Sequence, residues 1–249
     1  MKYHELGDLT HYATNNFFKM SWSDKLQILE DIISGLKNIH HANTIHKNYH
    51  SGNIFMSTSR AVTGDLGISK SAIESSNDSD DNEIYGIIPY VSPEIFQGQK
   101  YTKDSDIYSL GMIMWELMTG RRPFWDQDHN TDLIIRICDG LRSPVVTNAP
   151  KGYIELMQKC WNLDPKKRIT AADLLKKIED ICRIELENKM NQNPTKIIKS
   201  SDIGPITTKN PGAIYKSRPL SEMIKSAEST RNLSSRSITL SKLSEYFIL

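Results

Sequence analysis

Polar side chains that could take part in chemistry gather in two short stretches in the first third of the chain. The first, residues 45–55, contains His46, Asn48 and Asn53, and the second begins with Asp65-Leu66-Gly67. Asn53 and Asp65 carry oxygen atoms of the kind that a hard cation accepts. An amide such as that of Asn48 cannot accept a proton at neutral pH. The first stretch therefore offers no carboxylate that could serve as a general base.

Three further landmarks follow these stretches. Residues 89–94 read Pro-Tyr-Val-Ser-Pro-Glu, residues 104–111 begin with Asp-Ser-Asp and end with Gly, and residues 160–168 run from Cys-Trp to Lys-Lys-Arg. A lone His-x-Asn or Asp-x-Gly carries little weight, because such short polar motifs occur by chance in many loops. Five stretches in one order are far more specific than any one of them.

Together these stretches resemble the large, C-terminal lobe of a protein kinase of the tyrosine-kinase-like group, and the resemblance covers residues 1–182. In that family the first stretch reads His-Arg-Asp, four residues and Asn, and the second reads Asp-Phe-Gly. The resemblance places Asn48 at the position of the catalytic base. It assigns Asn53 and Asp65 to the cofactor, as ligands of magnesium. It therefore implies Mg-ATP as the cofactor and a degenerate catalytic position.

The resemblance also implies four structural residues. His46 is expected to pack beneath the two loops without taking part in the chemistry. Glu94 and Arg168 are expected to form a buried ion pair under the segment that ends at Glu94. Asp106 is expected to accept backbone N–H groups from the loop that contains His46.

Residues 5–12 resemble the family's stretch just after the hinge between the lobes, so we expect the sequence to begin at the hinge and the small lobe to be absent. Neither a Gly-rich phosphate loop nor its partner lysine is recognisable before residue 20. Nucleotide binding is accordingly expected to be weak. The cleft surface around Leu6, Leu9, Ile54 and Leu66 is expected to form an exposed apolar patch.

The hydropathy pattern predicts a mainly α fold with one small β-hairpin. Apolar residues recur at helical spacing from residue 23 to residue 40 and are found nearly all round residues 104–118, which predicts a buried central helix that ends at Gly120. Further helices are expected at 131–138, 151–161 and 170–182, and hairpin arms at 54–56 and 60–63. Gly64, directly before Asp65, is expected to loosen the second loop.

Charge divides the chain into two regions. Residues 1–182 carry 20 Lys and Arg against 24 Asp and Glu, whereas residues 183–249 carry 11 against 6 and eleven serines. We therefore expect a kinase-like lobe at 1–187 and a basic, Ser/Lys-rich, disordered tail at 188–249. No stretch is apolar enough for a signal peptide or a membrane span, so we expect a cytoplasmic protein that binds neither membranes nor nucleic acid.

These patterns favour a truncated pseudokinase that acts in signalling through binding to other proteins, with other kinases among its partners. The alternative is an ATP-dependent Ser/Thr or Tyr protein kinase whose N-terminal lobe is missing from this sequence. In this chain the change Asn48→Asp is not expected to restore phosphate transfer, because positioning of the nucleotide phosphates is needed as well as a base.

Overall fold

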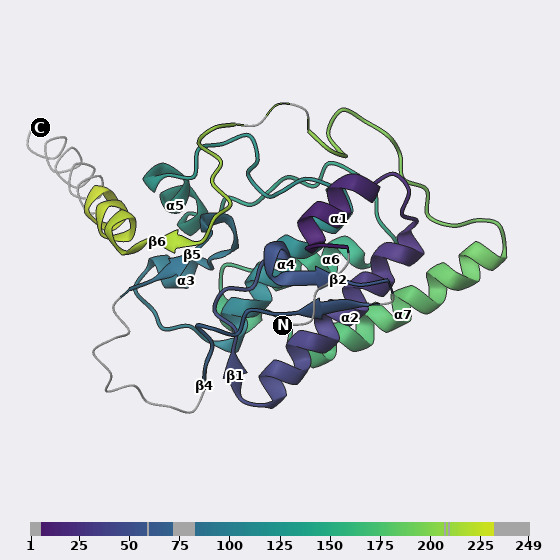
Figure 1. Cartoon of the computed structure of the whole chain (residues 1–249), viewed down its shortest axis with the longest axis horizontal. Helices are drawn as coiled ribbons and strands as arrows, with labels where there is room; N and C mark the ends of the chain where they lie inside the picture. The colour runs from purple at the N-terminus through teal and green to yellow at the C-terminus, as the bar shows by residue number, and fades with distance from the viewer. Residues whose placement is uncertain (1–5, 59, 72–82, 207, 209, 232–249) are drawn as a thin grey trace, which may run out of the picture.

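The computed structural model describes residues 6–58, 60–71, 83–206, 208 and 210–231. The mainly α architecture expected from the sequence is confirmed (Figure 1). The α-helices are α1 (Leu9–Asn16), α2 (Trp22–His41), α3 (Pro93–Phe96), α4 (Lys103–Thr119), α5 (Thr131–Cys138), α6 (Tyr153–Cys160) and α7 (Ala171–Met190). Residues 221–231 are also helical. Short 3-10 helices are η1 (Ser51–Asn53), η3 (Ile88–Tyr90) and η4 (Pro165–Lys167).

Three antiparallel pairs of short strands accompany these helices. Strand β1 (Thr44–Ile45) pairs with β4 (Lys70–Ser71), and β2 (Ile54–Met56) pairs with β3 (Ala61–Thr63) as the predicted hairpin. Strand β5 (Tyr85–Gly86) pairs with β6 (Arg218–Pro219). In the described part of the chain, each sheet has two strands.

Helix α4 forms the centre of the core, and every residue from Ser105 to Thr119 is buried. It begins at the capping residue Thr102 and ends at Gly120, which adopts a left-handed conformation with φ of 71°. A Cβ atom at Gly120 would lie 2.5 Å from the ring of Phe17, so this turn requires glycine for its space as well as for its backbone angle.

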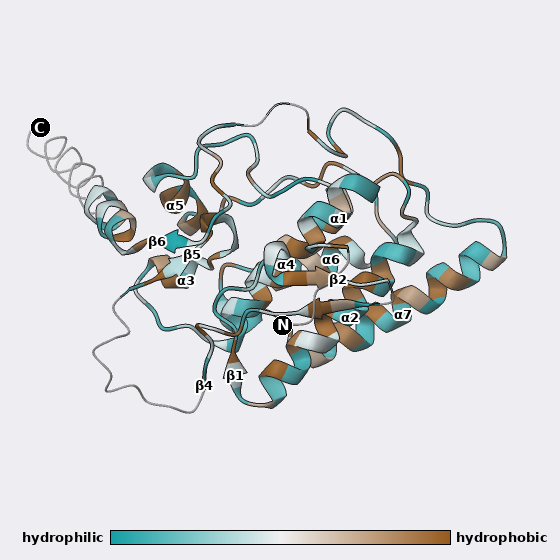
Figure 2. Ribbon diagram, in the orientation of Figure 1, coloured by the Kyte–Doolittle hydropathy of each residue, from teal (hydrophilic) through white to brown (hydrophobic). Residues whose placement is uncertain are grey.

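Helices α2 and α7 pack against each other along the lower side of the molecule in Figure 1. Helix α2 is started by a capping box between Ser21 and Asp24, and α7 by the side chain of Thr170, which accepts the N–H of Asp173. Both helices carry apolar and polar residues in alternation along their length (Figure 2). Their apolar faces complete the core around α4.

The prediction of an exposed apolar patch at the cleft is wrong for two of its four residues. Leu6 and Leu66 are 37% and 51% exposed, whereas Leu9 and Ile54 are 1% and 0% exposed. The reason is that α1 packs on η1 and β2, which places Leu9 and Ile54 in the core. None of the helices in the described residues is long and apolar enough to cross a membrane.

The segment after residue 187 differs from the disordered tail that its composition favoured. Helix α7 continues to Met190, and Ile203, Leu220, Ile224 and Ala227 are buried. These anchors are few and widely spaced, so average composition and periodicity do not reveal them. Residues 232–249 lie outside the described part of the chain, and the boundary at 187 stays a prediction.

Candidate functional site

The loop between β1 and η1 is held by the first turn of α4. The carboxylate of Asp106 accepts the backbone N–H of His46 at 2.8 Å and that of Lys47 at 3.0 Å. It also lies 2.9 Å from Nε2 of His40. Lys47 has a positive φ of 70°, so the backbone turns sharply directly before Asn48. Asp106 therefore fixes the path of the backbone up to Asn48.

Asn48 and Asn53 lie at the two ends of this loop, and both are nearly buried. The side-chain N–H of Asn53 donates to the backbone oxygen of Asn48 at 2.9 Å. This bond closes the loop and leaves the side-chain oxygen of Asn53 as its free acceptor. The amide side chain of Asn48 therefore belongs to a loop whose two ends are joined by this hydrogen bond.

The hairpin β2–β3 brings the loop of Asp65 next to that of Asn53. The N–H of Gly64 donates to the backbone oxygen of Asn53 at 2.9 Å, and the carbonyl of Gly64 lies 3.0 Å from Nε2 of His46. His46 thus packs beneath the two loops and joins them. Asp65 has a φ of 59°, and its side chain is exposed.

Gly64 was expected to loosen this loop, and the structure gives it another role. A Cβ atom at Gly64 would lie 2.6 Å from the ring of Phe55. Glycine therefore allows the Phe55 ring to pack directly on the backbone before Asp65.

A buried cluster behind the loop was missed by the sequence analysis. Glu116 of α4 accepts hydrogen bonds from the hydroxyls of Tyr90 and Ser51, the latter at 3.1 Å. The hydroxyl of Ser51 is in turn 2.7 Å from that of Thr10. Burial raises the pKa of Glu116 to about 8, although the charge of Arg122 and the Ser51 hydrogen bond act in the opposite direction. The signal in the sequence was the single carboxylate in the mostly apolar stretch of residues 107–118 of α4.

His50, which points toward this cluster, is neutral at physiological pH. Its ring centre lies 5.9 Å from that of Tyr90. Burial, with a smaller contribution from His46, lowers the pKa of His50 to about 4. The surroundings of Asn48 therefore contain an uncharged imidazole rather than a cation.

The raised pKa of Glu116 predicts a pH dependence of stability. Because the folded chain retains the Glu116 proton between pH 4.5 and 8 while the unfolded chain releases it, the free energy of unfolding should fall as pH rises through this window. Glu116→Gln should remove about 3 kcal/mol of that fall. Urea unfolding at pH 5 and pH 8 measures it, with the exposed carboxylate change Asp132→Asn as the control. Equal pH slopes for Glu116→Gln and the unsubstituted chain would contradict the assignment.

The predicted ion pair lies under the segment that ends at Glu94. Two guanidinium nitrogens of Arg168 each lie 2.7 Å from an oxygen of Glu94, and both side chains are buried. Arg168 also donates to the backbone oxygens of Asp104 and Asn162, each at 2.9 Å. Burial alone would raise the pKa of Glu94, but the hydrogen bonds and charge of Arg168 outweigh it and lower that pKa.

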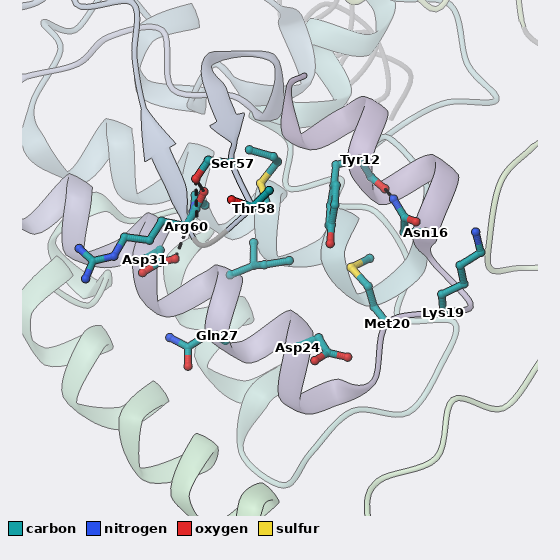
Figure 3. A pocket seen from close by; sticks show the side chains of 13 residues that line it. Tyr12, Asn16, Lys19, Met20, Asp24, Gln27, Asp31, Ser57, Thr58 and Arg60 are labelled. Carbon is teal, nitrogen blue, oxygen red and sulfur yellow. Dashed lines mark hydrogen bonds between the residues drawn. The ribbon is translucent and has the colours of Figure 1, made fainter. Parts of the chain in front are cut away.

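An open pocket of about 280 Å³ lies elsewhere, between α1, α2 and the turn that joins β2 to β3 (Figure 3). Tyr12, Met20 and Arg60 are among the residues that line it. Its lining includes none of Asn48, Asn53 and Asp65. The pocket is therefore separate from the two loops described above.

The comparison with protein families identifies the fold. The model of the family described as protein tyrosine and serine/threonine kinase matches residues 1–178. The chain belongs to this family. The matched region runs from α1 into the first half of α7, and it includes Asn48, Asn53 and Asp65.

Curated relatives of this chain are much longer proteins. A probable serine/threonine-protein kinase, roco8, of Dictyostelium discoideum is 31% identical over 195 residues, which cover 73% of this chain and 10% of that protein. Cyclic GMP-binding protein C of the same organism is 29% identical, over 70% of this chain and 7% of its own length. A putative serine/threonine-protein kinase/receptor, R831, of Acanthamoeba polyphaga mimivirus is 25% identical, over 71% and 11%. The chain therefore spans about a tenth of the curated relatives it matches.

Proposed function

We propose that this lobe is a catalytically impaired member of the kinase family, a pseudokinase of the tyrosine-kinase-like group, which acts in signalling by binding other proteins, other kinases among them. The observation that carries the proposal is Asn48. It stands at the position of the base, in a loop whose backbone is hydrogen-bonded at residues 46, 47 and 48 by the side chains of Asp106 and Asn53. The proposed impairment therefore comes from the chemistry of one side chain and not from a change in the structure of the loop.

The size of this loss follows from general acid–base catalysis. A positioned base typically contributes about 10²–10⁴-fold to the rate of proton transfer, and an amide cannot replace it. The neighbouring His50 does not compensate by electrostatics, because burial keeps it neutral. An impaired lobe of this kind would retain the surfaces through which kinase-family proteins bind partners.

The donor atoms of Asn53 and Asp65 fit a magnesium ion. Both residues offer hard oxygen ligands, and among the described residues the one hydrogen bond of the Asn53 side chain uses its nitrogen. Within the described residues, no group of three His, Cys, Asp or Glu could hold a metal, so further ligands would have to come from water or phosphate. Bound there, magnesium would neutralise phosphate charge.

These two retained donors favour the second candidate function, an ATP-dependent protein kinase. The names of the relatives in Dictyostelium discoideum and in the mimivirus agree with it, since several are described as serine/threonine-protein kinases. The two functions differ in one measurable respect. Only the working kinase requires bound Mg-ATP.

The test is a phosphotransfer assay and a thermal-shift assay with Mg-ATP. We expect the chain to transfer no measurable phosphate and its melting temperature to be unchanged by Mg-ATP. Asn48→Asp should give the same result, because the described residues contain no Gly-rich loop or lysine to position the phosphates. Asp65→Ala is the matched control for metal binding. Stabilisation by ATP that Asp65→Ala abolishes, or phosphate transfer by the unsubstituted chain, would favour the working kinase instead.

A further inference from the structure

Strand β6 and the residues around it pack on the lobe. In the sequence, β6 lies more than a hundred residues after its pairing partner, β5. Strand β6 lies antiparallel to β5, with Tyr85 opposite Pro219 and Gly86 opposite Arg218 (Figure 1). The ladder is extended by the N–H of Leu220, which donates to the oxygen of Ile84 at 2.7 Å. The N–H of Ile84 in turn donates to the hydroxyl of Ser221 at 3.0 Å. The segment thus adds a strand to β5 in the manner of a bound peptide.

The chain then turns into the helix of residues 221–231, whose apolar side chains face the lobe. Leu220, Ile224 and Ala227, spaced at i, i+4 and i+7, are all buried. They share a cluster with Ile88 and Val91 and with Leu133 and Ile137 of α5, among other residues. This spacing is that of an amphipathic helix seated in a groove. A second core of the lobe is therefore completed by the C-terminal segment.

Polar contacts hold both ends of this segment. Arg218 donates to the backbone oxygen of His129, and His129 lies 2.9 Å from the oxygen of Ile214. At the far end, Arg231 pairs with Asp139 at 2.8 Å. The Arg231–Asp139 pair is exposed and adds little energy, so the apolar anchors dominate.

Strand β5 is part of a functionally important region of the lobe. It lies between the Asp65-Leu66-Gly67 motif and Glu94, the stretch whose order controls protein kinases. The residues after β5 form η3, whose Ile88 packs in the same cluster as Leu220. The position of this stretch and the seating of the C-terminal segment are therefore coupled.

We propose that the surface formed by residues 84–91, α3 and α5 is a peptide-binding groove, and that residues 218–227 of the same chain are its resident, displaceable ligand. The partner it fits is a peptide that is extended and then helical, with a basic residue followed two positions later by leucine, and with further apolar residues four and seven positions after that leucine. The inference deepens the protein-binding role proposed above and rests on it. The test below measures occupancy of the groove and not phosphate transfer, so this inference and the proposed function can fail separately.

The test uses the full chain and a fluorescent synthetic peptide of residues 214–231. In the unsubstituted chain the tethered segment competes at an effective concentration near millimolar, so the peptide should bind weakly. Leu220→Asp places a charge in the second core, releases the segment and should tighten peptide binding by about tenfold or more. Ser226→Asp, which adds the same charge on the exposed side of the same helix, is the matched control and should leave the weak binding unchanged. A peptide that itself carries Leu220→Asp should not bind.

A milder variant keeps the proposal testable where Leu220→Asp lowers stability too far. Leu220→Ala should speed amide hydrogen exchange in residues 84–88 by about tenfold or more, while Ser226→Ala should not change it. The proposal is overturned if Leu220→Asp melts cooperatively yet fails to bind the peptide, or if all chains bind it equally. It is also overturned if exchange at 84–88 is unchanged by Leu220→Ala. A dimer that only Leu220→Asp dissociates would place the segment of a second copy in the groove and contradict the intrachain assignment.

Discussion

Arg168→Leu is expected to lower the free energy of unfolding by about 3–5 kcal/mol, because it leaves the carboxylate of Glu94 buried without its cation. The substitution also removes the donors to the backbone oxygens of Asp104 and Asn162, which join the start of α4 to the segment before η4. Denaturation by urea, followed by circular dichroism, measures the change.

The matched control for Arg168→Leu is Arg183→Leu on α7. Arg183 pairs with Asp180 and Glu187, but all three side chains are exposed, so its loss should cost no more than about 1 kcal/mol. Adding Glu94→Leu to Arg168→Leu should recover much of the loss, since an apolar pair of similar volume needs no charge compensation. If Arg168→Leu and Arg183→Leu lowered the free energy of unfolding equally, the buried pair would contribute no more to stability than the exposed pairs of Arg183.

Lys25→Met is expected to raise the free energy of unfolding by about 3 kcal/mol at pH 7. Lys25 is 1% exposed, its Nζ has no hydrogen-bond partner among the described residues, and burial lowers its pKa to about 7. At pH 7 the folded chain must therefore either release the Lys25 proton that the unfolded chain holds or keep it in a buried site, at roughly 1.4 kcal/mol per unit of the pKa shift. The ring of Phe17, whose centre lies 3.7 Å from Nζ, offsets part of this cost.

The sign of this effect can be checked by its pH dependence. Because the folded pKa lies below the unfolded value of 10.5, the unsubstituted chain should gain stability as pH rises from 7 to 10.5, and Lys25→Met should lack that gain. The advantage of the variant should therefore be largest at pH 7 and small near pH 10. Lys159→Met, at an exposed lysine of α6, should change neither stability nor slope. A stability loss in Lys25→Met at pH 7 would contradict the interpretation.

The elements of the lobe could be predicted because local patterns specify them. Helix α5 has the bounds expected from its apolar spacing, and α4 was recognisable as a buried helix from apolar residues on every side. The contacts of Glu94 with Arg168 and of Asp106 with His46 could also be predicted, because the five stretches fix their relative places in the fold.

Tertiary contacts without a local signal could not be predicted. The hydroxyls around Glu116 come from α1, η1 and η3, which are far apart in sequence. Leu220 and Ile224 are two apolar residues in a serine-rich region. Their role as buried anchors becomes visible only in their packing against the second core. The residues of α2 around Lys25 alternate between apolar and polar as in an ordinary amphipathic helix, which gives no sign that Lys25 is buried. Its burial depends on the packing of the Phe17 ring against it.

The bonds of Asp106 have a consequence for how such a lobe can change over time. They are made to the backbone N–H groups of residues 46 and 47, which every amino acid except proline supplies. These two bonds therefore do not depend on the side chains of residues 46 and 47, and neither involves the side chain of residue 48. A substitution at position 48 therefore leaves both bonds in place, so a change in the chemistry of this side chain need not remove the support that Asp106 gives to the loop.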